Sequence, residues 1–159
     1  MSKIAQRQIV ASISPSSSGN IEAPPTPGAD NGLVYYAQVT GGEITASVEK
    51  VYIGGKLFPE VLCAPAEIGD ITVTRHYDSG IDAVFLGSLR QMVGRAYYDI
   101  QIDELNCNVA VPELQRTYSK ALLVGLTEPD GDAASGAPST YSLTFSIQSV
   151  ISGSTTVTA

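Results

Sequence analysis

One feature limits the fold of this chain more than any other: a single helical pattern stands among several segments patterned as β-strands. A period of two between apolar and polar residues, with many β-branched and aromatic residues, is typical of strands that bury one face. Six segments have this character, at residues 33–39, 43–53, 68–77, 97–103, 119–126 and 141–151. Helices do not alternate with these strands, so the sequence disfavours a parallel α/β fold.

The one predicted helix follows the third of these strands. Ile81, Phe85 and Leu89 lie among apolar residues that recur at helical spacing, which places them on one face of an amphipathic helix. Gly94 follows at a position that suits the end of a helix. The sequence therefore predicts a mainly-β fold, an antiparallel β-sandwich or barrel with one flanking α-helix at about residues 80–93.

The length of 159 residues suits a single domain over residues 1–159 with a sizeable core. Two stretches of this domain are predicted to be irregular. Residues 14–31 contain four prolines, which prevent regular structure, so we expect an N-terminal loop or arm there. Residues 152–159 are expected to form a loose C-terminal tail. Gly54 and Gly55 lie between two strand-like runs and predict a hairpin turn.

The charge of the chain argues against several classes of partner. Nine Lys and Arg against sixteen Asp and Glu give a formal net charge of −7. Nucleic acids and anionic membranes attract proteins through Lys and Arg, so this balance argues against binding to either. The N-terminus lacks a long apolar run, and the uncharged residues 133–159 are rich in Ser and Thr. We therefore expect a soluble protein, made in the cytoplasm, with neither a signal peptide nor a membrane span.

Residues suited to catalysis or metal binding are scarce. His76 is the single histidine, Cys63 and Cys107 are the two cysteines, and no G-x-S-x-G motif is present. We expect His76 on the surface and both cysteines as reduced, partly buried thiols. The Asp130-Gly-Asp132 sequence lacks the other ligands of a calcium loop and reads as a turn tip. The sequence thus predicts no catalytic, cofactor-binding or metal-binding residues, and no enzymatic activity.

The most informative segment is the long final strand at 141–151, which carries no charge. Its polar face consists of Ser, Thr and Gln, whereas exposed strand edges are usually protected by charged residues. This composition favours strands that are covered by copies of the same protein. A central strand in a monomer's own sheet is the alternative.

The order of segments then resembles a known family. EITASVEKVYIGGKLFPEV, ITVTRHYDS, IDAVFLGSLRQMVGR, YYDIQIDEL, SKALLVGL and STYSLTFSIQSV follow one another between residues 43 and 151. Together they resemble the major tail tube proteins of long-tailed bacteriophages, which are related to the tube proteins of contractile tails and type VI secretion. The clearest part is a strand that ends in T-R-x-Y-D, followed by a short helix and a polar strand.

This resemblance implies a structural virion protein. Subunits of the family form stacked hexameric rings, and their inner sheets join into a continuous β-barrel around a hollow conduit for viral DNA during ejection. The implied partners are further copies of this chain, a tape measure protein, and tail terminator and initiator proteins. The DNA passes through without specific binding, and no membrane binding is expected. The implied location is the virion tail, after assembly in the host bacterial cytoplasm.

Acidic side chains are candidates for the lining of such a conduit, because carboxylates repel phosphate. The polar face of the strand at 97–103 offers Asp99 and Asp103, which we rank first. Glu43 and Asp70 lie at or near strand starts and are further candidates. The alternative is that these residues only solubilise the outer surface.

The loop at 14–31 and the turn-rich tip at 128–138 are candidate contacts between rings, because flexible segments can become ordered on a neighbouring molecule. The residues of these two segments predicted to make such contacts are Ser16, Pro24, Pro25, Asp130 and Asp132.

Other functions stay open at this stage. Alternating strands also permit a small-ligand-binding β-barrel, which needs an apolar interior pocket. A head–tail joining or decoration protein of a phage is another possibility. A hydrolase with two carboxylates would use Asp99 and Asp103 as its acid and base.

Overall fold

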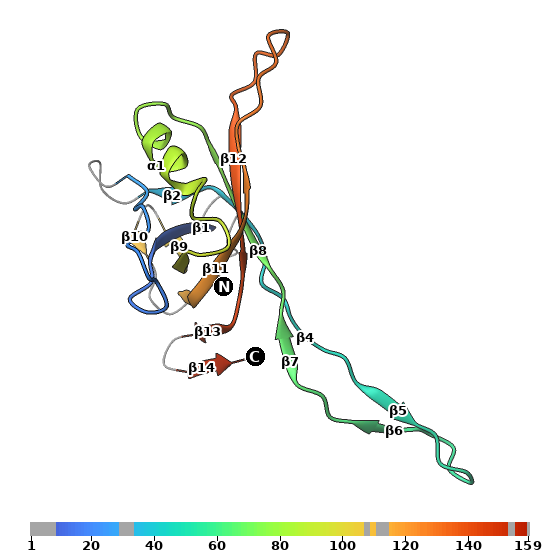
Figure 1. The fold of residues 1–159 in the computed structure, drawn as a ribbon. Coiled ribbons are helices and arrows are strands. Elements are labelled where there is room, and N and C mark those ends of the chain that lie inside the picture. Colours follow the sequence, from blue (N-terminus) through green and yellow to red (C-terminus); the bar gives the residue numbers. More distant parts are fainter. Residues whose placement is uncertain (1–8, 29–33, 107–108, 111–114, 153–154, 159) are drawn as a thin grey trace.

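The computed structural model describes residues 9–28, 34–106, 109–110, 115–152 and 155–158. It shows a β-rich body from which two hairpins project, with a single helix in the described part of the chain (Figure 1). The predicted mainly-β fold with one flanking helix is confirmed. Within the described ranges, no helix is long and apolar enough to span a membrane.

The body is an antiparallel sheet that closes on itself. Its strands are β1 (Ile9–Pro15), β2 (Tyr35–Tyr36), β3 (Gln38–Gly41), β8 (Ile71–His76), β9 (Tyr97–Asn106), β11 (Arg116–Thr127) and β12 (Thr140–Ser146). They are ordered β2-β1-β9-β11-β12-β8-β3. Only Ala37 separates β2 from β3, so this one segment pairs with β1 at its start and with β8 at its end. These pairings close the sheet into a barrel, so that β1 and β8 each have a strand on both sides.

The core fills the inside of this barrel. Alternate residues of each strand point inward, as the period of two predicts. On β8 and β12 the inward residues are Ile71, Val73, Tyr141, Leu143 and Phe145, and each has an exposed fraction of 1% or less. Aromatic rings from different strands meet edge to face, which is a favoured geometry.

Helix α1 (Asp82–Leu89) covers one side of the barrel and buries Phe85, Leu86 and Leu89 against it. The helix is shorter than the predicted 80–93. The chain leaves the helix after Leu89 through turns, and Gly94 adopts φ +83°, where glycine is favoured. The Gly94 N–H then donates to the Leu123 carbonyl at 2.7 Å, which ties the turn to β11. Apolar residues beyond Leu89 continue the helical spacing but pack in these turns.

A buried polar cluster attaches α1 to the barrel. The Asp82 carboxylate is fully buried and accepts hydrogen bonds from Arg75 Nη1 at 2.9 Å and from the Tyr141 hydroxyl at 3.1 Å. Its second oxygen accepts the Asp78 backbone N–H at 2.9 Å. The Tyr36 hydroxyl lies 3.2 Å from that of Tyr141. Each buried polar group is thus paired, as burial of a charge requires.

Burial raises the pKa of Tyr141 from 10.0 to about 12 and also raises the pKa of Tyr36. The protonated phenols are favoured in the folded state, so their stabilisation is complete below pH 10 and is lost as the pH rises through 12. We expect the free energy of unfolding to fall over this alkaline range, with a shallower fall in Tyr141→Phe. Urea unfolding of the parent and of Tyr141→Phe across this pH range measures the fall in the free energy of unfolding. The control Tyr52→Phe removes an exposed hydroxyl, and an equal effect of both variants would contradict the prediction.

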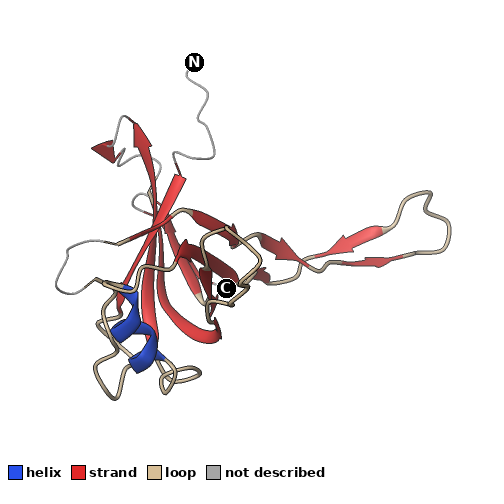
Figure 2. Ribbon diagram, turned by 90° about the horizontal axis from the view of Figure 1, so that it is seen from above, coloured by secondary structure: helices blue, strands red, loops and turns tan. Residues whose placement is uncertain are grey.

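The first projection, which we call the arm, comprises residues 43–70 and extends the β3–β8 pair. It contains two short ribbons, β4 (Ile44–Ala46) with β7 (Ala66–Ile68) and β5 (Glu49–Val51) with β6 (Glu60–Leu62). From above, the arm leaves the barrel as a thin ribbon without support on either side (Figure 2). A turn does form at the predicted Gly54 and Gly55: Gly55 has φ +86°, and Lys56 N–H donates to the Ile53 carbonyl. The connection between β5 and β6 is longer than a two-residue hairpin turn, however, and comprises residues 52–59.

The second projection, which we call the tip, comprises residues 128–139 between β11 and β12. It leaves the opposite end of the long strands from the arm (Figure 1). The Ser139 hydroxyl donates to the Asp130 carbonyl at 3.0 Å, and Ala134 N–H donates to Asp132 Oδ1 at 3.0 Å. The tip is therefore a set of short turns, as its sequence predicts.

Two predictions about the chain ends need correction. Residues 14–31 were expected to be irregular throughout, but β1 continues through Pro15, and residues 29–33 lie outside the described ranges. The expected loose tail at 152–159 instead contains β14 (Thr155–Thr158), which pairs with β13 (Ser149–Ser152). β13 in turn pairs with β11, so this hairpin extends the main sheet. The short β10 (Val109–Ala110) pairs with β9.

Candidate assembly surfaces

The acidic residues ranked first for the conduit lining have partners within their own molecule. Asp99 Oδ1 accepts the backbone N–H of Lys120 at 3.0 Å, beside a shift in the register of β9 and β11. Lys120 has φ +52°, which is unusual for a residue other than glycine, and Asp99 supports this conformation. Asp103 has an exposed fraction of 4% and accepts from the amides of Gln101 and Gln115. These contacts favour a structural role for both carboxylates.

We expect Asp99→Ala to lower the free energy of unfolding by about 1–3 kcal/mol, because the Lys120 N–H loses a charged acceptor. Asp99→Asn keeps an acceptor oxygen and should lose less. Urea unfolding measures both, with the exposed Asp70→Ala as the control. A stability loss in Asp99→Ala no larger than that of the control would contradict the prediction. It would show that the register shift between β9 and β11 does not depend on the hydrogen bond from Lys120 N–H to Asp99.

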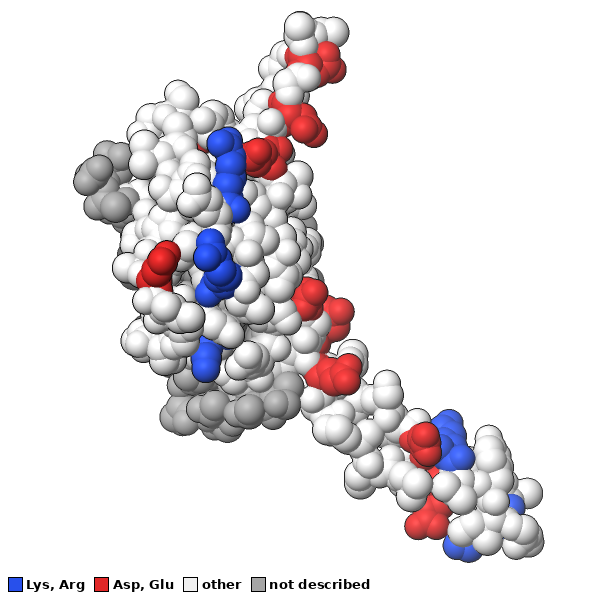
Figure 3. Space-filling model, in the orientation of Figure 1, with Lys and Arg blue, Asp and Glu red and all other residues white. Residues whose placement is uncertain are grey.

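The other two acidic candidates, Glu43 and Asp70, are exposed at the base of the arm. Gly69 N–H donates to the Glu43 carbonyl at 2.8 Å, which closes the two strands of the arm. Gly41 has φ +95°, and a Cβ there would lie 1.9 Å from the Asp70 carbonyl oxygen, so only glycine allows this close approach. Figure 3 shows acidic residues along this edge of the molecule, where the arm leaves the body.

The predicted ring contacts fall into two groups. Ser16, Pro24 and Pro25 pack against their own barrel: Ser16 N–H donates to the Tyr97 carbonyl at 3.0 Å, and the Pro25 carbonyl accepts the Tyr98 hydroxyl at 2.8 Å. Pro24 is buried. Asp130 and Asp132 of the tip, in contrast, are exposed and far from the core, where another molecule could reach them.

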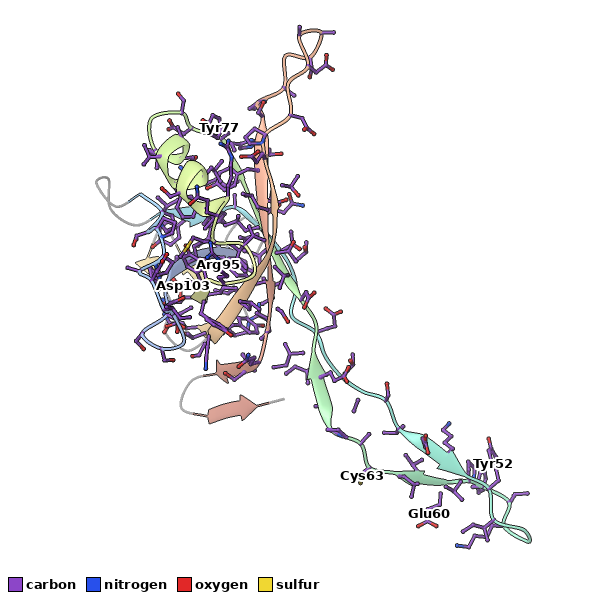
Figure 4. The ribbon with its side chains drawn as sticks, viewed as in Figure 1. Tyr52, Glu60, Cys63, Tyr77, Arg95 and Asp103 are labelled. Atoms are coloured by element: carbon purple, nitrogen blue, oxygen red, sulfur yellow. The ribbon has the colours of Figure 1, made fainter. Side chains whose placement is uncertain are left out.

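The arm exposes an unusual amount of apolar surface, which sequence analysis did not anticipate. Tyr52, Leu57 and Phe58 have exposed fractions of 80%, 89% and 76%. The large apolar residues exposed along the arm are Ile44, Val48, Val51, Tyr52, Ile53, Leu57, Phe58, Val61 and Leu62. Figure 4 shows Tyr52 and Cys63 on the arm, away from the body. So many exposed apolar side chains on one projecting segment indicate an interaction site.

A second surface has the opposite character. Where β3, β8, β12 and β11 lie side by side, their outward residues form two cross-strand rows. We call these rows the hydroxyl wall; they are Gln38–Thr74–Ser142–Thr127 and Thr40–Thr72–Thr144–Gly125. The Thr72 and Thr144 hydroxyls lie 3.3 Å apart and share a hydrogen bond. These eight residues include no charged and no large apolar side chain, but Val124, which precedes Gly125 at the register shift of β11, is 42% exposed beside them.

A ligand-binding interior is not favoured by this barrel. Tyr98, Tyr118 and Phe145 occupy its inside with exposed fractions of 2% or less. The hollows on its outside include one of about 350 Å³, near α1, lined by Ile21, Met92 and other residues. This open recess differs from the enclosed apolar cavity of a lipocalin-like protein.

Residues suited to catalysis or metal binding are dispersed in the described ranges. His76 is exposed at the end of β8, and Cys63 is exposed on the arm rather than partly buried as predicted. Cys107 lies outside the described residues. Within those residues, no group of three or more His, Cys, Asp or Glu could hold a metal ion.

Comparison with known proteins identifies solved structures that share this fold. No family model and no curated sequence matches the chain. A chain of the anti-feeding prophage baseplate superimposes with a TM-score of 0.70 at 18% identity, covering 96% of this chain and 97% of that one. A chain of the sheath–tube complex of the extracellular contractile injection system PVC gives 0.66 at 18% identity, covering 99% and 93%. Hcp1 from Flavobacterium johnsoniae gives 0.54 at 11% identity, covering 94% and 99%.

The chain therefore has the fold found in Hcp and in tube-type proteins of contractile injection systems. This agrees with the predicted tail-tube-like fold and with the suggested relation to contractile-tail and type VI secretion tubes.

Proposed function

We propose that this chain is the building block of a tail tube, a hollow conduit made of stacked hexameric rings. The fold, shared with proteins of contractile injection systems, supports this proposal. The observation that carries it is the arm, whose large apolar residues are exposed in the single molecule.

The arm needs a partner for physical reasons. A two-stranded ribbon by itself is only marginally stable in water. Burial of one Leu or Phe side chain contributes about 1.5–3 kcal/mol, so covering Leu57, Phe58 and Tyr52 together would strongly favour association. In a tube, the surface that covers the arm belongs to a neighbouring copy of this chain.

The positions of the arm and the tip would allow such contacts to repeat from one subunit to the next along a filament. They leave opposite ends of the same long strands (Figure 1). A contact between one end of a molecule and the other end of the next is heterologous, and it extends into a filament unless its rotation closes a ring. Asp130 and Asp132 on the tip are the predicted contacts that remain exposed for this purpose.

The finer proposal is a bacteriophage tail tube through which viral DNA passes during ejection. The net charge of −7 supports it, because a conduit that binds DNA would stop its movement. The further partners of such a tube are a tape measure protein and tail terminator and initiator proteins. Its location is the virion tail, after assembly in the host bacterial cytoplasm, and its role is structural rather than enzymatic.

Electron microscopy of the purified protein at high concentration tests the proposal. We expect annular particles with six-fold symmetry and stacks of them, and sedimentation should show a shift to large species as the concentration rises. Compact monomers alone, even in the presence of the tail initiator components, would overturn it.

A further inference from the structure

We infer that Gly41 and Gly42 form a fixed kink at the rim of the barrel, and that this kink sets the direction of the arm before the subunit meets a neighbour. The direction of the arm is a property of the single molecule. Its use in assembly rests on the proposed function, because a tube brings many arms into identical contacts. The kink is separate from the apolar residues of the arm that make those contacts.

The regular pairing of strands is interrupted where the arm begins. The β3–β8 ladder ends at Gly41, and the β4–β7 ladder begins at Ile44. A backbone hydrogen bond from Gly69 N–H to the Glu43 carbonyl, at 2.8 Å, bridges this interval. The two-stranded ribbon can therefore change direction between the two ladders without breaking either of them.

Two consecutive glycines supply the change of direction. Gly41 has φ +95° and Gly42 has φ +78°. Residues with a Cβ rarely adopt positive φ, because the side chain then lies too close to the backbone, whereas glycine adopts it readily. A glycine of this conformation bends and twists the strand that contains it. Two in succession at the start of the arm thus define the angle between the arm and the barrel.

Contacts with the barrel hold the kink in place. A Cβ on Gly41 would lie 1.9 Å from the Asp70 carbonyl oxygen, and a Cβ on Gly42 would lie 2.9 Å from the Tyr118 hydroxyl oxygen. Tyr118 belongs to β11 and is 2% exposed, so the kink lies directly on the barrel core. The glycines at the apex of the arm, residues 54–55, differ, since a Cβ on either would have no atom within 4 Å. The apex has open space around it, and the kink has none.

A fixed direction matters because the arm carries the residues that make the contact. An arm that swings freely would lose this freedom at every contact, and the lost entropy would weaken association. Repeated identical contacts also require that each subunit presents its arm in the same way. Gly41 and Gly42 are therefore positioning residues, which act through the arm rather than by touching the neighbouring subunit.

A distance measurement between two spin labels tests whether the arm has a fixed direction. The starting protein has both native cysteines replaced by Ser and carries Leu57→Ser/Phe58→Ser, which we expect to keep it monomeric. The labels are attached at Glu67→Cys, exposed on β7 next to the kink, and at Val84→Cys, exposed on α1. We expect double electron–electron resonance to give one narrow distance distribution. A broad distribution would show that the arm swings, and it would overturn the inference.

Substitutions at Gly42 test whether the kink sets this direction. Each is made together with Tyr118→Phe, which removes the hydroxyl nearest to the new side chain and serves as the parent. Asn tolerates positive φ, whereas the β-branched side chain of Val does not. We expect Gly42→Asn to keep the parent distance distribution and, with Leu57 and Phe58 restored, to form tubes. Gly42→Val should shift the distribution or broaden it about twofold, and should form no tubes.

The remaining outcomes separate the explanations. An unchanged distribution in Gly42→Val overturns the inference, whether tubes form or not, because the direction of the arm then does not depend on the kink. An equal change in Gly42→Asn also overturns it, because φ is then not the cause. If circular dichroism shows that Gly42→Val does not fold, Gly42→Ala takes its place with the same expectations. Absence of tubes in the parent with Leu57 and Phe58 contradicts the proposed function, and the distances still decide the inference.

Discussion

Leu57→Ser/Phe58→Ser is expected to abolish tubes while the subunit stays folded. These two residues are 89% and 76% exposed in the single molecule, so their loss removes little from the core. We expect the free energy of unfolding to change by no more than about 0.5 kcal/mol, as for ordinary surface substitutions. Association, in contrast, loses apolar burial of about 1.5–3 kcal/mol for each residue at every repeated contact. Sedimentation and electron microscopy measure assembly, and urea unfolding measures stability.

A control substitution makes this result specific. Val84 is 82% exposed on α1, outside the arm, so Val84→Ser removes a comparable apolar group from another surface. We expect tubes to form in this variant. If Leu57→Ser/Phe58→Ser forms tubes as readily as Val84→Ser does, the arm is not the element that holds the subunits together.

The second large effect is expected in the buried cluster between α1 and the barrel. Asp82→Ala leaves the Arg75 guanidinium and the Tyr141 hydroxyl without their shared acceptor. Removal of one partner from a buried ion pair costs about 3–5 kcal/mol, because the remaining charge is left uncompensated. We expect a loss of this size in the free energy of unfolding, against little change for the exposed Asp130→Ala.

A double-mutant cycle identifies the source of that loss. Arg75→Ala/Asp82→Ala should be less destabilised than the sum of its two single variants, since the pair acts as one unit. Urea unfolding of the three variants and the parent provides the four energies. An additive result would show that the two residues contribute independently, contrary to the contact between them.

Much of this fold follows from local sequence patterns. β8 was predicted because its inward residues Ile71 and Val73 alternate with polar residues. The strand predicted at 141–151 is divided into β12 and β13. β12 lies between β11 and β8, so it is a central strand of the molecule's own sheet, as the alternative interpretation had it, rather than an edge covered by another copy. The turn at Gly54 and Gly55 was predicted from backbone preference alone. Other elements depend on contacts between distant parts of the chain. β14 is a strand because β13 pairs with it, and its short Thr-rich sequence gave no comparable signal.

The surfaces were harder to predict than the strands. A period of two shows that a strand has two different faces, but it does not show whether any other element covers them. Residues 43–53 were therefore correctly predicted to form a strand, interrupted in the structure between β4 and β5, without a sign that the arm stands alone. Asp99 and Asp103 lie on the polar face as expected, yet their partners Lys120 and Gln115 come from a distant segment. The assignment of Glu43 and Asp70 to the conduit remains a prediction.

The closed barrel has a consequence for synthesis on the ribosome. β1 pairs with β9, for example Ile13 with Ile100, so β1 must wait for a partner that is made much later. The apolar arm emerges in between, before the barrel that carries it can close. Pairing between strands that are far apart in the sequence slows folding, and it leaves intermediates whose exposed apolar surface makes them prone to aggregate. We therefore expect nascent chains of this protein to depend on chaperones that shield the apolar arm until β9, β11 and β12 have been made.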